Sequence, residues 1–282
     1  MNHNTRYTII YYLGVFILLV IIAVPLCWNL LISITPEKEL LAPHTYFLPP
    51  VPDYTKYLRI VTPNTKENAL LYNALVNSIL LSAITLIVAM PTAVAASYAL
   101  VRYEFAYKTL VKACIFSTLV IPVATTIIPI YSLYRVLHIT DTLWGTSLIY
   151  VSALLPIAVW LGIQYFQALP QELWQAAELD GFSEKQLFFY VIFPLSRPLL
   201  LTMALIMFLL TWKQFMIPAI LLSSTQNKVI TVALSAFITK HAIPYTLIAA
   251  CGFIAILPPA LSAIIFRKYL LSGLTSGSTK QL

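Results

Sequence analysis

The sequence predicts an all-helical membrane protein, and three observations carry that prediction. Of the 282 residues, 60% are hydrophobic and only 10% are charged, whereas charged residues make up about 25% of typical soluble domains. Six stretches are apolar over the roughly 20 residues that a helix needs to cross a bilayer. Runs such as 115–123 and 199–210 lack the alternation of a barrel strand, which leaves helices as the spanning element.

We therefore expect one domain, residues 1–282, that forms a polytopic bundle of six transmembrane helices. The expected spans are about 9–34, 72–101, 110–136, 146–167, 197–222 and 246–270. The first is a retained helix and not a signal peptide, because its apolar run is too long and lacks a small-residue cleavage site. Lys and Arg residues beside span ends, from Arg102 to Lys112 and at Arg267 and Lys268, favour both termini on the cytoplasmic side.

A polar loop, residues 168–196, separates two of these spans and predicts a cytoplasmic docking site. Pro170 suits the first position of a helix, and Gly181 suits the left-handed residue that ends one. Ser183 and Gln186 have the spacing of a capping box that starts a second helix. The first helix would present one face of mostly small residues to a partner: Leu173, Ala176, Ala177 and Asp180.

Several classes of function are disfavoured by what the chain lacks. None of its seven glycines opens a phosphate-binding loop, so we expect no bound nucleotide. No cluster of side chains has the spacing of a catalytic or metal site, which argues against an enzyme. The spans after the first outer loop lack carboxylates, which disfavours the alternative of an ion-coupled secondary transporter or channel. The net charge of +7 is scattered beside helix ends, a pattern that indicates contact with membrane lipid and not with nucleic acid.

The polar loop contains a spaced set of residues: Gln175-Ala176-Ala177, Asp180-Gly181, Val191, Phe193 and Pro194. This set resembles the EAA motif of ABC importer permeases. Further matches resemble the carbohydrate-importer branch, specifically the second permease subunit of maltose-type systems. These are Asn77-Ser78, residues 97–100 with Arg102, Pro122, residues 128–131, Asp141-Thr142, residues 266–269 and residues 272–277.

The resemblance implies a multi-pass subunit of the cell (inner) membrane that pairs with a second permease subunit and two ATPase subunits. An extracytoplasmic solute-binding protein would supply the substrate. ATP and Mg²⁺ would bind the ATPases, so this chain would hold no cofactor and would not itself be an enzyme. The residues that would couple it to an ATPase are Glu172, Leu173, Gln175, Ala176, Ala177, Asp180, Gly181, Phe182 and Pro194.

Two residues depart from the family pattern. Gln175 stands where glutamate is usual, so charge for docking would have to come from Glu172 or Glu178. Lys213 stands where asparagine is more frequent, inside an expected span, where a charge costs at least about 2.5 kcal/mol. Lys213 would either meet an acidic group of the substrate or of the partner permease, or extend to the outer membrane interface.

The resemblance implies a sugar or oligosaccharide as the substrate, and Lys213 would suit one that is acidic or phosphorylated. Polar side chains within the spans could line its pathway, although hydrogen bonds between helices explain such groups as well. The expected pathway residues are Lys213, Gln214, Trp212, Asn77 and Gln164.

Overall fold

The computed structural model describes the chain except for residues 1–2, 43–47, 50, 64, 239–243 and 276–282. Ser276 and Gly277, the last two residues of the 272–277 match to the permease family, lie outside the described residues. The chain divides into two compact units. The first unit holds Met1–Tyr72 and Ala233–Leu257, and the second holds Asn73–Val232 and Pro258–Leu282. Three helices continue from one unit into the other, so the single domain stays a prediction.

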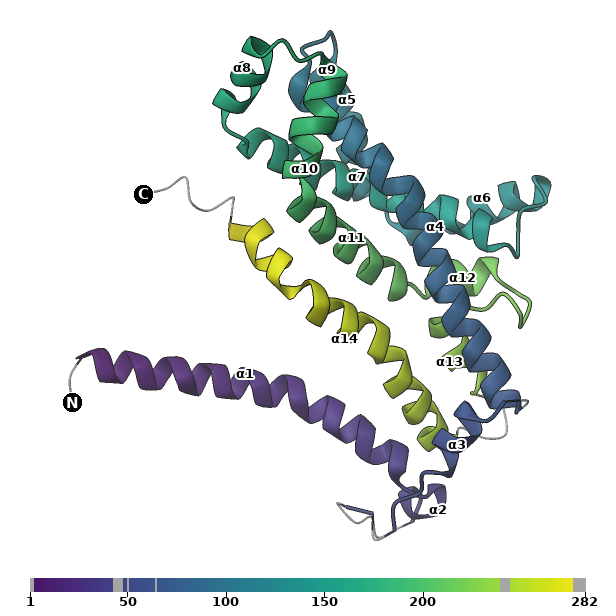
Figure 1. The fold of residues 1–282 in the computed structure, drawn as a ribbon. Coiled ribbons are helices and arrows are strands. Elements are labelled where there is room, and N and C mark those ends of the chain that lie inside the picture. The colour runs from purple at the N-terminus through teal and green to yellow at the C-terminus, as the bar shows by residue number, and fades with distance from the viewer. Residues whose placement is uncertain (1–2, 43–47, 50, 64, 239–243, 276–282) are drawn as a thin grey trace. The chain divides into compact units, whose positions relative to one another are not determined.

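Every regular element of the described residues is helical, which confirms the predicted fold class (Figure 1). Four helices are long and apolar enough to cross a membrane by themselves. They are α1 (His3–Ile34), α4 (Lys66–Arg102), α7 (Leu143–Ala168) and α14 (Tyr245–Thr275). In α1, no residue of the most apolar 18-residue stretch is buried, so this stretch is available for contact with lipid.

The third expected span is a bent pair of helices. α5 (Lys108–Ser117) and the 3₁₀ turn η1 (Thr118–Val120) precede α6 (Val123–Val136), and the two parts meet at 99°. The expected span 110–136 is therefore bent within its length, and its crossing of the membrane as one span stays a prediction. Pro122 has no N–H to donate to a preceding turn, and it favours extended backbone in the residue before it, where Ile121 has ψ 116°.

The fifth expected span is also interrupted. α11 (Arg197–Trp212) ends at Lys213, and a separate short helix, α12 (Met216–Leu221), follows. A second bend, of 68°, separates α11 from the helical turns before it. The expected span 197–222 is therefore interrupted after Trp212. The described residues contain six spans only if each bent pair counts as one, so the expected set of six spans stays a prediction.

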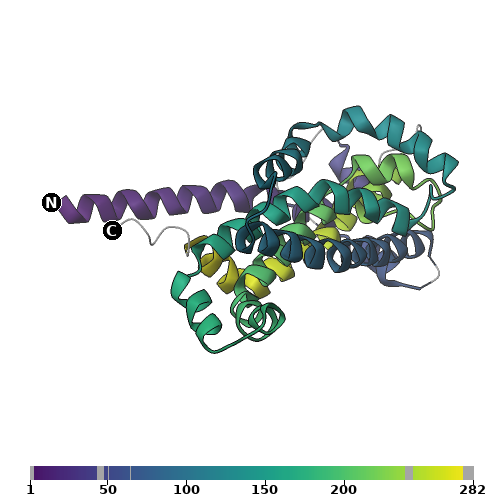
Figure 2. The ribbon, with the colours of Figure 1, turned by 90° about the horizontal axis from the view of Figure 1, so that it is seen from above.

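The remaining elements are short and connect these helices. They are α2 (Glu37–Leu40), α3 (Thr55–Val61), α8 (Gln171–Leu179), α9 (Glu184–Gln186), the π-helix η2 (Leu187–Ile192), α10 (Phe193–Leu195) and α13 (Ile230–Ala236). Four of them, α8 to α10 with η2, build the 168–196 loop. Within the second unit, both views place this loop and α6 at separate corners (Figures 1 and 2).

The core of the second unit depends on small residues where α4 meets α7. Ala89, Ala93 and Ser97 recur every four residues along α4 and are fully buried. Gly162 of α7 faces Ser97 so closely that an added Cβ would lie 2.6 Å from the Cβ of Ser97. A larger residue at either position would force these two helices apart.

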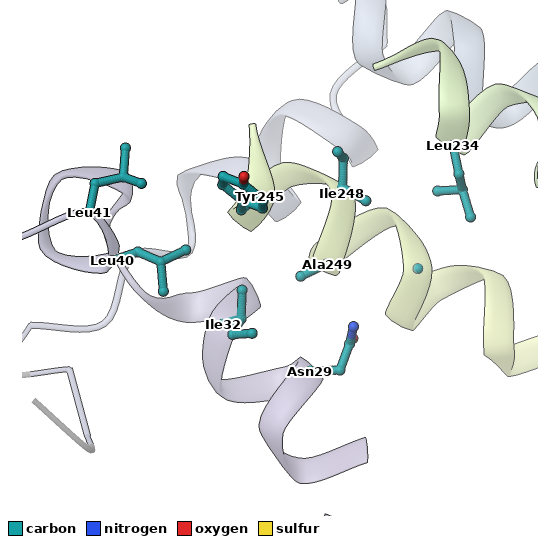
Figure 3. A pocket seen from close by; sticks show the side chains of 9 residues that line it. Asn29, Ile32, Leu40, Leu41, Leu234, Tyr245, Ile248 and Ala249 are labelled. Atoms are coloured by element: carbon teal, nitrogen blue, oxygen red, sulfur yellow. The ribbon is translucent and has the colours of Figure 1, made fainter. Parts of the chain in front are cut away.

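In the first unit, Glu37 ties α2 to the start of α14. Its carboxylate accepts hydrogen bonds from the backbone N–H of Tyr245, at 3.1 Å, and from the hydroxyl of Thr246. An apolar hollow of about 580 Å³ lies beside this contact. Figure 3 shows Ile32, Leu40 and Ile248 around it. None of the predicted pathway residues lines this hollow.

Candidate functional site

The turn in the 168–196 loop is built by local backbone hydrogen bonds around Gly181. Gly181 has φ +75°, the left-handed conformation that glycine adopts without strain. The N–H of Phe182 donates to the carbonyl of Ala177 at 3.0 Å, and that of Gly181 donates to Glu178 at 3.1 Å. This pair of bonds is the Schellman motif that ends α8. The predicted helix end at Gly181 is confirmed.

The second helix of the loop starts at the predicted capping box. The Ser183 hydroxyl accepts from the N–H of Gln186, and the Gln186 side chain accepts from the N–H of Ser183. At the other end of α8, Pro170 is the residue before the helix, with ψ 138°, and not its first helical residue. The expectation for Pro170 was therefore wrong by one position.

The inner side of the loop packs into the chain's own core. Ala177 and Leu187 are 4% and 1% exposed and share a hydrophobic cluster with Tyr98 of α4. The Tyr98 ring also lies 6.0 Å from that of Trp174 and 4.8 Å from that of Phe188. Ala177 therefore cannot offer its side chain to a partner, which corrects its predicted role.

The outward face of α8 is displaced by one residue from the predicted one. Its members are exposed and follow the helical i, i+3, i+4, i+7 spacing: Glu172, Gln175, Ala176 and Leu179. We call these four residues the outward face. Leu173 of the predicted set is half-buried, whereas Leu179, which the sequence interpretation missed, is 89% exposed. The predicted helical spacing was correct, but which residues are exposed depends on which side chains pack against Tyr98.

The other predicted loop residues have mixed positions. Asp180 and Gly181 are exposed at the end of α8, and Phe182 is 39% exposed beside them. Pro194 is half-buried within α10. Before it, residues 187–192 form a π-helix, which the sequence motif did not reveal. π-helical turns are rare and frequently mark functional segments.

An arginine at the end of α4 holds both helices of the loop. The Arg102 guanidinium donates from Nη2 to Glu178 Oε1 at 2.6 Å and to Glu184 Oε1 at 2.7 Å. Its Nε donates to the same Glu184 oxygen at 3.1 Å, and the group lies 5.5 Å from the centre of the Trp174 ring. Glu178 is thus paired within the chain. Of the two acids expected to supply docking charge, Glu172 remains on the outward face.

The Arg102 contacts border a polar hollow of about 420 Å³. Gln167, Gln171 and Gln175 line it together with Arg102 and Trp174. Gln175 therefore lies at the rim of this hollow as well as on the outward face. The side chain of Gln175 is neutral, and Glu178, 3 residues later, is already paired with Arg102. Neither residue therefore offers a free charge to a partner at this place.

The predicted pathway residues near Lys213 lie at the break between α11 and α12. Lys213 is exposed, and its ammonium has no ion pair within the residues that the structure describes. Trp212 is 7% exposed and lies against Phe208, with ring centres 5.4 Å apart. Gln214 is half-buried, and its carbonyl accepts from the Thr231 hydroxyl at 2.6 Å. Of these three residues, Lys213 alone is exposed.

Asn77 has a structural role instead of the predicted place in a pathway. Its side chain is 9% exposed and donates to the carbonyls of Gln226 and Lys228 at 2.6 and 3.0 Å. The next residue, Ser78, accepts from the N–H of Ile230 at 2.8 Å. These bonds fix the 222–229 loop, which connects α12 to α13, against α4. The prediction for Asn77 was wrong because a buried amide here satisfies backbone carbonyls.

Asp141 fixes the 222–229 loop from the turn before α7. Its carboxylate accepts from the N–H groups of Ser223 and Ser224 at 2.9 and 3.0 Å. Burial by itself would raise the pKa of Asp141, but the hydrogen bonds from Ser224, Ser223 and Asn227 hold it below its ordinary value. Asp141 has φ +56°, a left-handed conformation that aspartate tolerates better than most residues.

Gln164 is separated from the other predicted pathway residues. It is exposed on α7, 14 residues after Tyr150, which borders the small cavity at Trp212 and Gln214. At 1.5 Å per residue this separation is roughly 21 Å along the helix. The structure thus brings Trp212 and Gln214 together and leaves Gln164 near the 168–196 loop. No group of three potential metal ligands occurs within the described residues.

Comparison with known proteins identifies the architecture. The model of the family described as binding-protein-dependent transport system inner membrane component matches residues 68–275, most of the chain. The sulfoquinovosyl glycerol transport system permease protein SmoH of Agrobacterium fabrum is 26% identical over 256 residues, 91% of this chain and 88% of that one. The trehalose/maltose transport system permease protein MalG of Thermococcus litoralis is 26% identical over 282 residues, 99% of each chain.

A solved structure has the same fold. It belongs to a bacterial ABC transporter that imports the acidic polysaccharide alginate, and it matches with a TM-score of 0.79 and 20% identity. The match covers 95% of this chain and 98% of that one. This similarity shows a shared fold and agrees with the predicted all-helical architecture.

Proposed function

We propose that this chain, which belongs to the family of binding-protein-dependent transport system inner membrane components, is one of two permease subunits of an ATP-driven sugar importer. The family places it in the membrane as a transport component and not an enzyme. In the proposal, a second permease subunit completes the pathway, two ATPase subunits bind ATP and Mg²⁺, and a solute-binding protein delivers the substrate. The 168–196 loop and both termini face the cytoplasm.

The observation that carries the proposal is the construction of the 168–196 loop. Its inner side is fixed to α4 by Ala177, Trp174 and Arg102, while the outward face is left free. The inner side of α8 is held in place, so its outward face, with Leu179 89% exposed, can meet another protein without first becoming ordered. We place the ATPase on this face. Gln175 makes the contact depend on shape around Ala176 and Leu179, with Glu172 as its acidic group.

The names of the relatives support a carbohydrate as the substrate. The proteins similar to this chain are named for sulfoquinovosyl glycerol and for trehalose and maltose. The structure with the same fold imports an acidic polysaccharide. Lys213 is exposed at the break between α11 and α12 and has no ion pair among the described residues, which agrees with a substrate or partner group of opposite charge. We propose a saccharide that carries an acidic group and meets Lys213.

Co-purification and ATP hydrolysis test the proposal. The complex is expected to contain an ATPase, and its hydrolysis is expected to rise when the solute-binding protein and a saccharide are added to proteoliposomes. Leu179→Asp should reduce the amount of co-purified ATPase, because it places a charge in an apolar contact. Leu179→Met conserves volume and should retain the ATPase. Transport without any ATPase would refute the proposal.

Lys213 has its own test across neutral, uronate-containing and phosphorylated saccharides. Lys213→Asn should weaken the apparent affinity for an acidic saccharide by about ten-fold or more, the effect of losing one charge-assisted contact of about 1.5–3 kcal/mol. Lys213→Arg keeps the charge and should retain most of the affinity. An unchanged affinity in Lys213→Asn would exclude the contact with substrate and leave the partner permease or the outer membrane interface as the surroundings of Lys213.

A further inference from the structure

Helix α4 is attached at two distant points to two loops of the second unit. Near one end, Asn77 and Ser78 hold the 222–229 loop and the start of α13. At the other end, Arg102 holds α8 and α9 of the 168–196 loop. The two points are 25 residues apart, which at 1.5 Å per residue is roughly 38 Å, longer than the hydrocarbon core of a bilayer. Figure 1 shows α8 and α9 at one end of α4, and α12 and α13 toward the other.

The attachment through Arg102 is strong because it consists of several contacts that restrain one another. One guanidinium joins residues from two helices, so neither α8 nor α9 can shift along α4 without losing an ion pair. The hydroxyls of Tyr98 and Tyr103 also bond Glu184 Oε2, at 3.2 and 3.4 Å. Trp174 covers the guanidinium, which limits its contact with water. Surface ion pairs usually contribute little, but planar arginine contacts in such a network are specific in geometry.

The attachment at the other end consists of neutral hydrogen bonds made by two buried residues of α4. Asn77 and Ser78 are 9% and 4% exposed. If the 222–229 loop moved away from α4, the amide of Asn77 and the hydroxyl of Ser78 would lose these partners in a buried place. Unpaired buried polar groups are costly. The loop and the helix are therefore expected to move together.

We propose that α4 is the element that transmits movement between the two faces of the membrane, with Arg102 and Asn77 as its positioning residues. The inference rests on the proposed function, since it assigns the 168–196 loop to the ATPase and the 222–229 loop to the side of the solute-binding protein. When the outer loop is displaced by a loaded solute-binding protein, α4 carries the displacement to α8 and α9. α4 remains helical through Pro91, and its buried Ala89, Ala93 and Ser97 keep it close to α7.

The test measures the stimulation of ATP hydrolysis by the loaded solute-binding protein in the reconstituted complex. Arg102→Gln and Asn77→Leu are each expected to lower the stimulation about five-fold or more, the lower end of typical coupling between sites. Co-purified ATPase and unstimulated hydrolysis should stay near the wild-type level. A purely structural role would instead lower the yield of complex and both rates in proportion.

Three further variants make the test specific. Lys108→Gln removes a neighbouring ion pair, to the 88% exposed side chain of Glu104, and should leave stimulation unchanged. Arg102→Lys keeps the charge but cannot form the same two-sided contact, so an intermediate stimulation is expected. The double variant Arg102→Gln with Asn77→Leu should be no worse than either single one, because both interrupt the same connection.

Two results would overturn the inference while leaving the proposed function intact. One is full stimulation in either single variant with ATPase bound, and the other is a double variant whose loss is the product of the two single losses. Absence of ATPase from the wild-type complex is a different result. It would refute the proposed function, and the inference with it.

Discussion

The 168–196 loop and the 222–229 loop are both polar segments between apolar helices, but they obtain their conformations in different ways. The turn of the first is made by neighbours in sequence, through Gly181 and the Ser183–Gln186 capping box. The second is shaped by Asn77, Ser78 and Asp141, which lie 82 to 152 residues away in the chain. Local hydrogen bonding can be inferred from residue types and spacing, whereas the distant contacts exist only after the helices pack.

The largest expected effect comes from Gly181→Pro, which attacks the locally built turn. Proline fixes φ near −65°, whereas Gly181 has φ +75°, and proline also removes the N–H that bonds Glu178. We expect ATPase stimulation to be lost while insertion into the membrane continues. Gly181→Asn is the control, since asparagine tolerates the left-handed conformation. Wild-type stimulation in Gly181→Pro would show that the turn is not needed for coupling.

The next effect comes from Asn77→Ala, which attacks the distantly built loop. Two hydrogen bonds to the 222–229 loop would be lost, each worth about 0.5–1.5 kcal/mol, so a cost of about 1–3 kcal/mol is expected. The measurement is the thermal unfolding temperature in detergent, together with the rate of proteolysis at Ser223 to Lys228. Asn73→Ala changes an exposed asparagine of the same helix and should alter neither. Equal behaviour of the two variants would contradict the assigned role of Asn77.

A smaller effect is expected from Ser183→Ala, which removes the capping box. Loss of such a cap costs typically about 1 kcal/mol. Because Arg102 also holds Glu184, the second helix should remain attached and stimulation should fall only slightly. Lys185→Ala, in the same turn and exposed, is the matched control. Hydrogen exchange of residues 184–187 measures the effect. Equally fast exchange in Lys185→Ala would show that the effect does not come from the loss of the cap.

The smallest effect is expected from Asp141→Asn, and it depends on pH. The pKa of Asp141 is held below its ordinary value of 3.8, so its contribution to stability is complete above that pH. The contribution is lost as the pH falls through the folded-state pKa. Wild type should therefore unfold at a higher temperature than Asp141→Asn at about pH 7, and the difference should shrink as the pH falls through the folded-state pKa of Asp141. A difference in unfolding temperature that grows as the pH falls would contradict a stabilising role of the ionised Asp141 carboxylate.

The two loops also show where sequence interpretation succeeded and failed. The helix end at Gly181 and the capping box were predicted because each depends on residues at most six positions apart. The outward face of α8 was displaced by one residue, since only Tyr98 and its aromatic neighbours decide that Ala177 points inward. Asn77 was assigned to a pathway, but a polar residue in an apolar span can either line a pathway or form hydrogen bonds within the protein. The hydrogen bonds to Gln226 and Lys228 select the structural one.

The sequence by itself determined the helical membrane class, the number of apolar stretches, the local turns of the 168–196 loop and the resemblance to importer permeases. These depend on hydrophobic length and on short-range hydrogen bonding, which are properties of neighbouring residues. The tertiary structure alone decided that Arg102 unites Glu178 and Glu184 and that two expected spans are interrupted. It also decided that Asn77 holds a distant loop. Contacts across 76 to 151 residues require packed helices, which no periodicity specifies.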